Sequence, residues 1–534
     1  MRDDSIKRHD SSAGPPSLPG AGVRECGRET PARAQDRAGR ASLHLLEIHS
    51  FAFMHRMRRK YGPDLTLGTI PRSEWEEIAS RGFSLVWLMG VWMRSAASRR
   101  CALDDKGLRL TYGEALPGWG EDDIAGSPYA VRSYRIDPHL GTDQDLLRAK
   151  SVINELGMGL VLDFVPNHLA VDHPWTESMP ECFVRGSGED IQRDPELFFL
   201  TGQGRVLAHG RDPHFPPWSD TAQVDFFSAR ARETLASELR RIAEYADGVR
   251  CDMAMLAINE VFAGTWGKYA QNQPPLKTEF WEEAISATRA VRPGFVFIAE
   301  AYWGLEQRLR GLGFDYTYDK TLYDLMFRGS PRELKQYVRI DEDVQRQCLR
   351  FIENHDEPRA APAFGRERSR AAAAIMATLP GLHLFYEGQR EGCAVRMPVQ
   401  LARRAEEHGD PEMERFYDIL LAFSSEEPMA TGTWKPLNVR SAWEGNRISE
   451  GLLAWLWHGG KRLKLVCVNY SGATAQGRIR IPPELVSGHP LAFRDALDEE
   501  TYIRSLDEVT TRGLYVELDP WKAHLLDLLT WPAG

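Results

Sequence analysis

The 534-residue chain has no apolar run that approaches the length of a membrane span. Its N-terminus leads into Ser-, Gly- and Pro-rich sequence without the apolar core of a secretory signal. It also lacks a basic surplus, because 66 Lys and Arg residues face 76 Asp and Glu residues, a formal net charge of −10. A chain with nucleic acid as its main partner normally carries the opposite balance. We therefore expect neither a membrane nor a nucleic acid as partner.

Cysteine is scarce and shows no pattern. The seven cysteines are odd in number, scattered, and without the spacing of metal ligands. Reduced thiols in a cytoplasm are the simplest account of such usage, so the sequence predicts a cytoplasmic protein. With 43% apolar and 27% charged residues the composition is that of a globular protein, and the length predicts two or three domains.

The chain divides into parts of different character. Residues 1–41 are rich in Arg, Asp, Gly, Pro and Ser and poor in aromatic residues, which predicts a disordered tail. In residues 42–428, short apolar runs alternate with amphipathic helical stretches, as in βα units that build a parallel sheet. Residues 169–224 break this rhythm and predict an insertion subdomain. Residues 429–534 carry alternating runs and a hairpin pattern over 453–468, which predicts a C-terminal antiparallel β-sandwich.

The central part contains eight candidate strands. Eight strands that alternate with helices predict an α/β fold, the closed (β/α)8 barrel, with the insertion after the third strand. The first three strands are Leu43–Ile48, Phe83–Leu88 and Gly159–Asp163, and five more end at Asp252, Glu300, about Lys320, Asn354 and Tyr386.

Four acidic segments stand where predicted strands emerge into loops. They are Asp163–His168, Gly248–Asp252, Phe297–Glu300 and Glu353–Asp356. In a (β/α)8 barrel the C-terminal strand ends meet on one face and supply the active site. Cleavage of an acetal with retention needs a carboxylate nucleophile and a carboxylic acid about 5 Å apart. We therefore expect these carboxylates to form a glycosidase-type site.

The second and third segments suit the two chemical roles. Arg250 and Asp252 are two apart on a strand, so their side chains point to one side and the cation favours the ionised nucleophile. A purely structural ion pair is an equal alternative for this fragment alone. Glu300 closes an apolar run that would desolvate it and raise its pKa, as a general acid requires. Tyr302 and Trp303 follow it and offer aromatic faces to a sugar, although ordinary packing is the alternative.

The remaining two segments add polar groups. Asp356 is a third carboxylate beside the His355 imidazole, placed to bond ring hydroxyls and help distort the sugar. Asp163 and His168 stand five apart, so the turn after the third strand can place His168 on the substrate while Asp163 holds the loop. For this fragment alone, turn capping is an alternative.

Together the four segments, in this order, resemble the four signature regions of the α-amylase family of glycoside hydrolases. The resemblance implies a retaining mechanism on α-glucans or short α-glucosides. Asp252 would be the nucleophile, Glu300 the acid/base and Asp356 the transition-state stabiliser. Arg250, His168 and His355 would line the subsite of the cleaved glucose unit, with Tyr129, in a segment that also looks like the family's, stacking on the ring.

Two departures from the family pattern bear on specificity. Met255-Leu256 stand where the family's amylases often place Lys-His, whose backbone helps to hold calcium, and Asn167 alone is not a metal site. We therefore expect no cofactor, with calcium as the alternative that stays open. His173–Trp175 and Phe314–Tyr318 look more like the maltosyl-transferring branch of the family.

Three functions remain open at this stage. The first is hydrolysis of α-glucosidic bonds in an α-glucan or oligosaccharide. The second is transfer of the sugar to a hydroxyl group or to phosphate, through the same covalent intermediate. The third is a barrel that binds carbohydrate or protein without catalysis, which the complete set of three acids disfavours. The sequence does not specify linkage, acceptor or oligomeric state.

Overall fold

The computed structural model describes residues 44–269, 277–460, 462–487 and 490–529. The predicted tail over residues 1–41 lies outside these ranges. Within them, no helix is both long enough and apolar enough to cross a bilayer.

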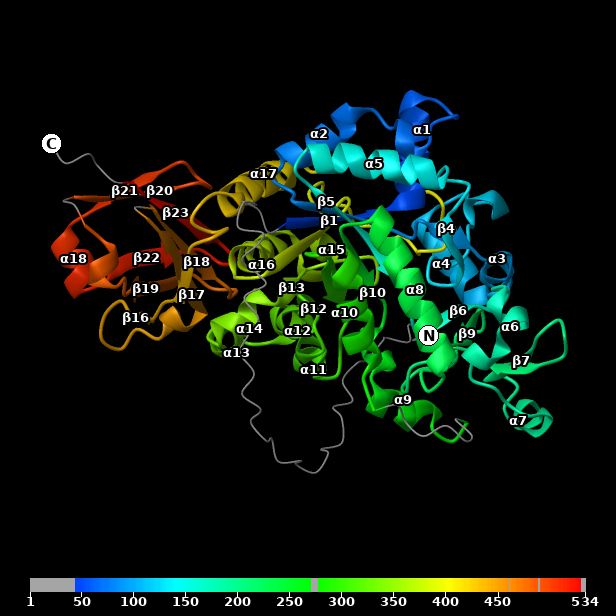
Figure 1. Cartoon of the computed structure of the whole chain (residues 1–534). Helices are drawn as coiled ribbons and strands as arrows, with labels where there is room; N and C mark the ends of the chain where they lie inside the picture. Colours follow the sequence, from blue (N-terminus) through cyan, green and yellow to red (C-terminus); the bar gives the residue numbers. More distant parts are fainter. Residues whose placement is uncertain (1–43, 270–276, 461, 488–489, 530–534) are drawn as a thin grey trace, which may run out of the picture.

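Eight parallel strands close into a barrel, which confirms the predicted fold class (Figure 1). The last strand pairs with the first, with Leu45 opposite Leu384, so the sheet has no free edge. In chain order the strands are β1 (His44–His49), β2 (Leu85–Met89), β5 (Gly159–Phe164), β10 (Gly248–Cys251), β11 (Val296–Ala299), β12 (Tyr316–Tyr318), β13 (Cys348–Arg350) and β14 (Leu382–Tyr386).

Helices cover the outside of the barrel, and the strands are buried on both faces. This explains why β2 and β5 are almost uniformly apolar instead of alternating. The long covering helices are α1 (Ser50–Tyr61), α2 (Arg72–Ser80), α5 (Asp143–Glu155), α8 (Ala229–Tyr245), α10 (Phe280–Val291), α12 (Lys320–Arg328), α16 (Arg366–Thr378) and α17 (Pro411–Ser425). Further helices are α3 (Ala96–Asp104), α4 (Lys106–Ala115), α9 (Asn259–Trp266), α11 (Glu306–Gly311), α13 (Pro331–Tyr337), α14 (Glu342–Arg346) and α15 (Ala360–Phe364).

Helix α5 shows how local sequence sets an element. Thr142 caps its N-terminus by accepting from the Asp145 backbone N–H, while Asp145 accepts from the Thr142 backbone N–H in return. The helix ends before Gly157, whose φ of +81° is open to glycine at little cost. The next strand therefore begins at Gly159, as the sequence predicts.

A subdomain of short elements stands between β5 and α8. Its strands pair antiparallel, β6 (His168–Ala170) with β9 (Thr221–Gln223) and β7 (Phe198–Leu200) with β8 (Val206–Ala208). Helices α6 (Trp175–Ser178) and α7 (Gly188–Arg193) complete it. A further two-stranded sheet, β3 (Trp92–Arg94) with β4 (Val131–Ile136), lies before α5. Because β6 follows β5 directly, this subdomain begins beside the C-terminal ends of the barrel strands.

The predicted end of the seventh barrel strand is wrong. The seventh barrel strand, β13, ends at Arg350, not at Asn354. The Asn354 side-chain oxygen accepts from the backbone N–H groups of Asp356 and Glu357, at 2.9 and 2.8 Å. Such an Asx-type turn replaces the ladder bonds of a strand, so Phe351–Asp356 forms a loop over the end of the barrel.

The C-terminal part folds into two antiparallel sheets that enclose a core of their own. The hairpin predicted over 453–468 is confirmed as β17 paired with β18. The six-stranded sheet contains β15 (Thr433–Pro436), β17 (Leu452–Gly459), β18 (Arg462–Asn469), β23 (Ala523–Leu529), β20 (Leu491–Asp495) and β21 (Thr501–Arg504). The second sheet contains β16 (Val439–Ser441), β19 (Ala475–Ile479) and β22 (Leu514–Leu518), and helix α18 (Leu506–Thr511) precedes β22.

Tryptophan side chains join the C-terminal sheets to the barrel. Trp455 and Trp457 of β17 both donate their indole N–H to the carbonyl of Thr378, at the end of α16, at 3.1 and 2.8 Å. Both rings belong to the same continuous apolar cluster as the barrel core. The two parts therefore share buried surface and are expected to support each other's stability.

We expect Trp455→Ala to lower the free energy of unfolding by about 3–5 kcal/mol, because the ring is fully buried and leaves a cavity. The midpoint of urea unfolding measures this. Trp443→Ala is the matched control, since that ring is 56% exposed and its loss is expected to cost less than about 0.5 kcal/mol. Equal midpoints for the two variants would contradict the shared core.

Candidate active site

Two neighbouring strands place the first two carboxylates side by side. In the pairing of β10 with β11, Cys251 lies opposite Ala299. Asp252 and Glu300 are the next residues on these strands, and neighbouring strands are about 4.8 Å apart. The register therefore brings the predicted nucleophile and the predicted acid/base together at the C-terminal end of the barrel.

One guanidinium group connects these two carboxylates. Arg250 is buried, and its Nη1 lies 2.5 Å from Asp252 Oδ1 while its Nη2 lies 2.8 Å from Glu300 Oε2. Its Nε donates to the Tyr318 hydroxyl at 3.2 Å. The planar fork of an arginine fits two acceptors in fixed directions, so Arg250 sets the position of both carboxylates.

Glu300 has the environment of a proton donor. Its Oε2 accepts from the Met253 backbone N–H at 2.6 Å and its Oε1 from the Tyr302 hydroxyl at 2.9 Å. Burial, followed by repulsion from Asp252 and Asp356, outweighs the attraction of Arg250 and raises the pKa of Glu300 to about 7. Burial also raises the pKa of Asp252, against the direct ion pair with Arg250. The pair therefore retains a proton near neutral pH, and we assign that proton to Glu300.

The third carboxylate, Asp356, lies in the loop after β13 and is held by a histidine. Its Oδ2 is 2.9 Å from His355 Nε2, and its side chain remains 46% exposed. Desolvation opposes the effect, but the charge and hydrogen bond of His355 lower the pKa of Asp356 to about 2. Asp356 is thus a permanent anion at the open side of the site.

His355 is buried and bonded at both ring nitrogens. Its Nε2 is also 2.6 Å from the hydroxyl of Tyr129, whose ring stacks on it at 5.4 Å. Its Nδ1 lies 2.5 Å from Oε1 of Glu47. Burial opposes protonation, yet Asp356 and Glu47 together raise the pKa of His355 to about 10. The ring therefore carries a positive charge at neutral pH.

Sequence reasoning missed Glu47, the partner of His355. It stands near the end of β1 and is completely buried. A signal was present, because an acidic residue between Leu46 and Ile48 interrupts an otherwise apolar strand. Only the fold brings it to His355, which is 308 positions away.

Asp163 holds the strand ends in place. Its Oδ1 accepts from the Trp87 indole N–H at 3.1 Å and its Oδ2 from the Gly90 backbone N–H at 2.7 Å. Burial raises its pKa to about 6. Both carboxylate oxygens accept hydrogen bonds from protein donors at the end of β2. Asp163 therefore holds the ends of β2 and β5 together beside the site.

The subdomain between β5 and α8 lies beside the carboxylates. His168 is buried, with the Trp218 ring 4.8 Å away, and burial lowers its pKa to about 4, so the ring is neutral. Trp303 adopts a left-handed φ of +63° after Glu300, and its ring contacts His214 of the subdomain at 4.9 Å. The loop after β11 and the subdomain therefore meet beside the carboxylates.

The oxygens of Asn167 are engaged within the protein. Its side-chain oxygen and its backbone carbonyl both accept from the Gln223 amide, at 3.0 and 2.9 Å. Elsewhere in the described ranges, one trio has ligand atoms close enough for an ion, Asp495, Asp498 and His524 in the C-terminal sheets. His524 and Asp495 already bond each other there, so that trio has the contacts of an ion pair.

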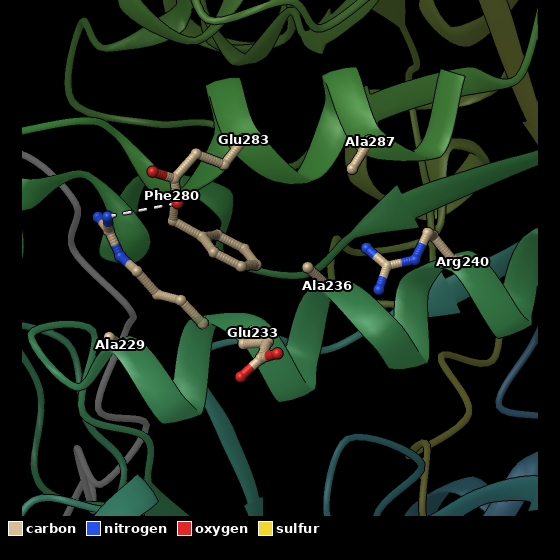
Figure 2. Close-up of a pocket in the computed structure, with 8 residues that line it drawn as sticks. Ala229, Glu233, Ala236, Arg240, Phe280, Glu283 and Ala287 are labelled. Atoms are coloured by element: carbon tan, nitrogen blue, oxygen red, sulfur yellow. Dashed lines mark ion pairs between the residues drawn. The ribbon is translucent and has the colours of Figure 1, made fainter. Parts of the chain in front are cut away.

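A hollow of about 290 Å³ lies elsewhere, between α8 and α10 on the outside of the barrel (Figure 2). Phe280 lies between the two helices, and Arg232 forms an ion pair with Glu283 at 3.7 Å. Glu233 and Glu283 are the carboxylates that line it, and neither follows a barrel strand. The hollow therefore has no part in the chemistry of the strand ends.

Comparisons with known proteins bear on the family. No family model matches the chain. Alpha-amylase MalA of Haloarcula japonica is 26% identical over 328 residues, 58% of this chain and 42% of the relative. Alpha-amylase 3 of Dictyoglomus thermophilum is 22% identical over 296 residues, 51% of this chain and 54% of the relative. An alpha-1,4-glucan:maltose-1-phosphate maltosyltransferase of Arcanobacterium haemolyticum is 25% identical over 394 residues, 68% of this chain and 47% of the relative. The chain spans about half the length of these curated relatives.

Solved structures share the architecture along most of the chain. The maltogenic alpha-amylase AmyB from Thermotoga neapolitana aligns with a TM-score of 0.65 at 19% identity, covering 92% of this chain and 99% of that one. An alpha-amylase from H. orenii aligns with a TM-score of 0.63 at 17% identity, covering 91% and 99%. At these low identities the structural similarity supports a shared fold and no more.

Separate observations on the sequence and on the fold agree. The four acidic segments occur in the expected order, and the fold gathers their carboxylates at one end of a closed barrel. Relatives found by sequence and neighbours found by structure include alpha-amylases. In sequence and in fold, the chain is similar to members of the α-amylase family of glycoside hydrolases.

Proposed function

We propose that the protein cleaves α-glucosidic bonds in α-glucans or short α-glucosides with retention, through a covalent glycosyl-enzyme. The single observation that carries the proposal is the Arg250 bridge between two carboxylates, one of which holds a proton near neutral pH. Retaining glycosidases need such a pair, one anionic and one protonated, on either side of the scissile bond.

The reaction follows from these two states. An Asp252 oxygen attacks the anomeric carbon as the glycosidic C–O bond breaks, and Glu300 gives its proton to the departing oxygen. The Glu300 carboxylate then takes a proton from water, whose oxygen attacks the same carbon and releases Asp252. Glu300 ends protonated and Asp252 ionised, so the enzyme is restored.

The surrounding groups act on the sugar. Asp356, anionic and partly exposed, would accept from ring hydroxyls and favour the oxocarbenium-like transition state. Arg250, His168 and His355 would line the subsite of the cleaved unit. The rings of Tyr129, Tyr302 and Trp303 would stack on sugar faces.

We also propose that the reaction needs no bound metal and takes place in the cytoplasm. The first proposal is supported by the engagement of Asn167 with Gln223 and by a chemistry that carboxylates complete without a Lewis acid. The second is supported by the free thiols of the six cysteines in the described ranges. Unchanged turnover after dialysis against a chelator would agree with the first.

Transfer is the second candidate, favoured by one observation. Six of the curated relatives bear the name alpha-1,4-glucan:maltose-1-phosphate maltosyltransferase, at 24–26% identity. In transfer, a sugar hydroxyl or a phosphate would take the place of water on the Asp252-bound sugar, with Glu300 removing its proton. The catalytic residues are the same in both reactions.

Asp252→Asn is expected to reduce turnover of an aryl α-glucoside by about 10⁴–10⁶-fold, because an amide cannot form the glycosyl ester. Release of the aryl alcohol measures this. Asp507→Asn, an exposed carboxylate of the C-terminal part, is the control and should keep full activity. Turnover by Asp252→Asn within about tenfold of the parent would reject the assignment.

The pH profile should report Glu300. It must be protonated to act as an acid, so kcat/KM is expected to fall as pH rises through about 7. Glu300→Gln should remove this alkaline limb. It should slow a poor leaving group by about 10²–10⁴-fold while sparing release of a good leaving group such as dinitrophenol. An alkaline limb that persists in Glu300→Gln would point to another proton donor.

Product analysis separates hydrolysis from transfer. With maltooligosaccharides in water, hydrolysis yields free reducing ends in proportion to bonds broken, whereas transfer leaves their number nearly constant. With phosphate added, transfer to phosphate yields a glycosyl phosphate that phosphorus NMR detects. We expect a net gain of reducing ends. A constant number with new chain lengths or a sugar phosphate would favour transferase action.

A further inference from the structure

Glu47 occupies an unusual position for a carboxylate. It lies near the end of β1, in register with Trp87 on one side and Tyr386 on the other, and its side chain is completely buried. Its Oε1 bonds His355, but its Oε2 has no hydrogen-bond partner among the described residues. A buried carboxylate with an unused oxygen is costly, so packing stability does not explain it.

The contacts define the state of the His355 ring. Nδ1 faces the Glu47 carboxylate, and Nε2 faces the Asp356 carboxylate. Ionised carboxylates only accept hydrogen bonds, so a ring that bonds both of them donates from both nitrogens and is an imidazolium, and the Tyr129 hydroxyl, 2.6 Å from Nε2, then accepts from the same N–H. Trp87 packs edge-on against it at 5.5 Å and Tyr129 stacks on it at 5.4 Å, and the two contacts restrict the plane of the ring.

We propose that Glu47 is a positioning residue, which holds His355 doubly protonated and in one orientation so that its Nε2–H is aimed at Asp356. The expected effect of Glu47 on turnover rests on the proposed function, since the orientation of Asp356 affects catalysis only if a sugar binds there. Its structural part concerns the proton state of one ring and stands by itself.

Other charges face this ring from several elements, and none of them takes the place of Glu47. Glu47 is the carboxylate that bonds Nδ1 and Asp356 the one that bonds Nε2, whereas the cation Arg250, which lies over the Tyr129 ring, opposes a second positive charge nearby. Groups with an electrostatic effect on His355 or its two partners include Asp163, Asp252, Glu300, Glu353, Glu357, Arg250, Arg396, His49, Tyr129, Tyr302, Tyr318 and Tyr386.

Removal of the Glu47 charge has a defined consequence. In Glu47→Gln the side-chain amide oxygen can still accept from Nδ1–H, but no anion supports the second proton. The neutral ring then turns the lone pair of Nε2 toward the Asp356 carboxylate and accepts from the Tyr129 hydroxyl instead. Asp356 loses its donor, its pKa rises, and its orientation toward the sugar is no longer set.

The ring can be observed directly in the whole protein labelled with ¹⁵N-histidine. We expect both His355 nitrogens of the parent to remain protonated from pH 6 to pH 8, and the assignment comes from the signal lost in His355→Gln. A neutral His355 in the parent at pH 8 would overturn the proposal without any further variant. In Glu47→Gln the ring should lose one proton within this range, and an unchanged titration would equally overturn it.

Kinetics then tests the consequence. Glu47→Gln should lower kcat about 10- to 100-fold with a smaller change in KM, as found when a carboxylate that orients a metal-bound histidine is removed. Glu47→Asp keeps the charge, so it should restore the imidazolium and part of the rate. Glu387→Gln is the matched control, a half-buried carboxylate directly after β14 that pairs with Arg56. A loss with Glu387→Gln equal to that with Glu47→Gln would reject a role specific to His355.

The two hypotheses fail in different ways. If the parent has no activity on any α-glucoside but His355 stays charged and responds to Glu47→Gln, the proposed function falls and the positioning contact stands. If the parent is active and His355 is neutral, the positioning role falls alone. If Glu47→Gln does not fold, the spectrum of the parent and that of Glu47→Asp still test whether Glu47 keeps His355 charged.

Discussion

The site depends on the contact of one guanidinium group with two carboxylates. Without Arg250, Asp252 and Glu300 would be two buried acids on neighbouring strand ends, and repulsion would drive protons onto both. With it, one charge is balanced and the other acid keeps a proton, which is the asymmetry a retaining mechanism requires. The strand register, the burial of Arg250 and the bond from Tyr318 all serve to keep that cation in place.

Residues close in sequence could be interpreted before the fold was known. The spacing of Arg250 and Asp252 on a strand predicts a shared face, and the apolar run before Glu300 predicts a desolvated acid, because both depend on local periodicity. The same holds for the β17–β18 hairpin and for the cap at Gly157. The end of β13 was missed because a side-chain bond from Asn354 competes with the ladder, and alternation carries no sign of it.

Glu47 was missed for a different reason. An acid inside an apolar strand is visible in the sequence, but its meaning depends on a partner 308 positions away that only barrel closure supplies. Closure pairs β1 with β14 and places the strand next to the loop after β13. A single sequence therefore gives the least information about contacts between the first and the last strands of a barrel.

The candidate catalytic residues can be predicted from the strand ends, but the choice between hydrolysis and transfer cannot, because it depends on the β11 loop and the subdomain. The carboxylates stand on strand ends, where the register is set by the whole sheet. In the proposed reaction, the group that accepts the sugar would enter beside Glu300, and Trp303 of the β11 loop contacts His214 of the subdomain close by. Water and a second sugar differ in what they need there, since a sugar gains from an aromatic face and from exclusion of water. A strained backbone at Trp303 holds its ring against the subdomain, so this contact shapes the side from which the acceptor arrives. Specificity between hydrolysis and transfer should therefore follow changes at this contact, while the rate of bond cleavage follows the strand ends.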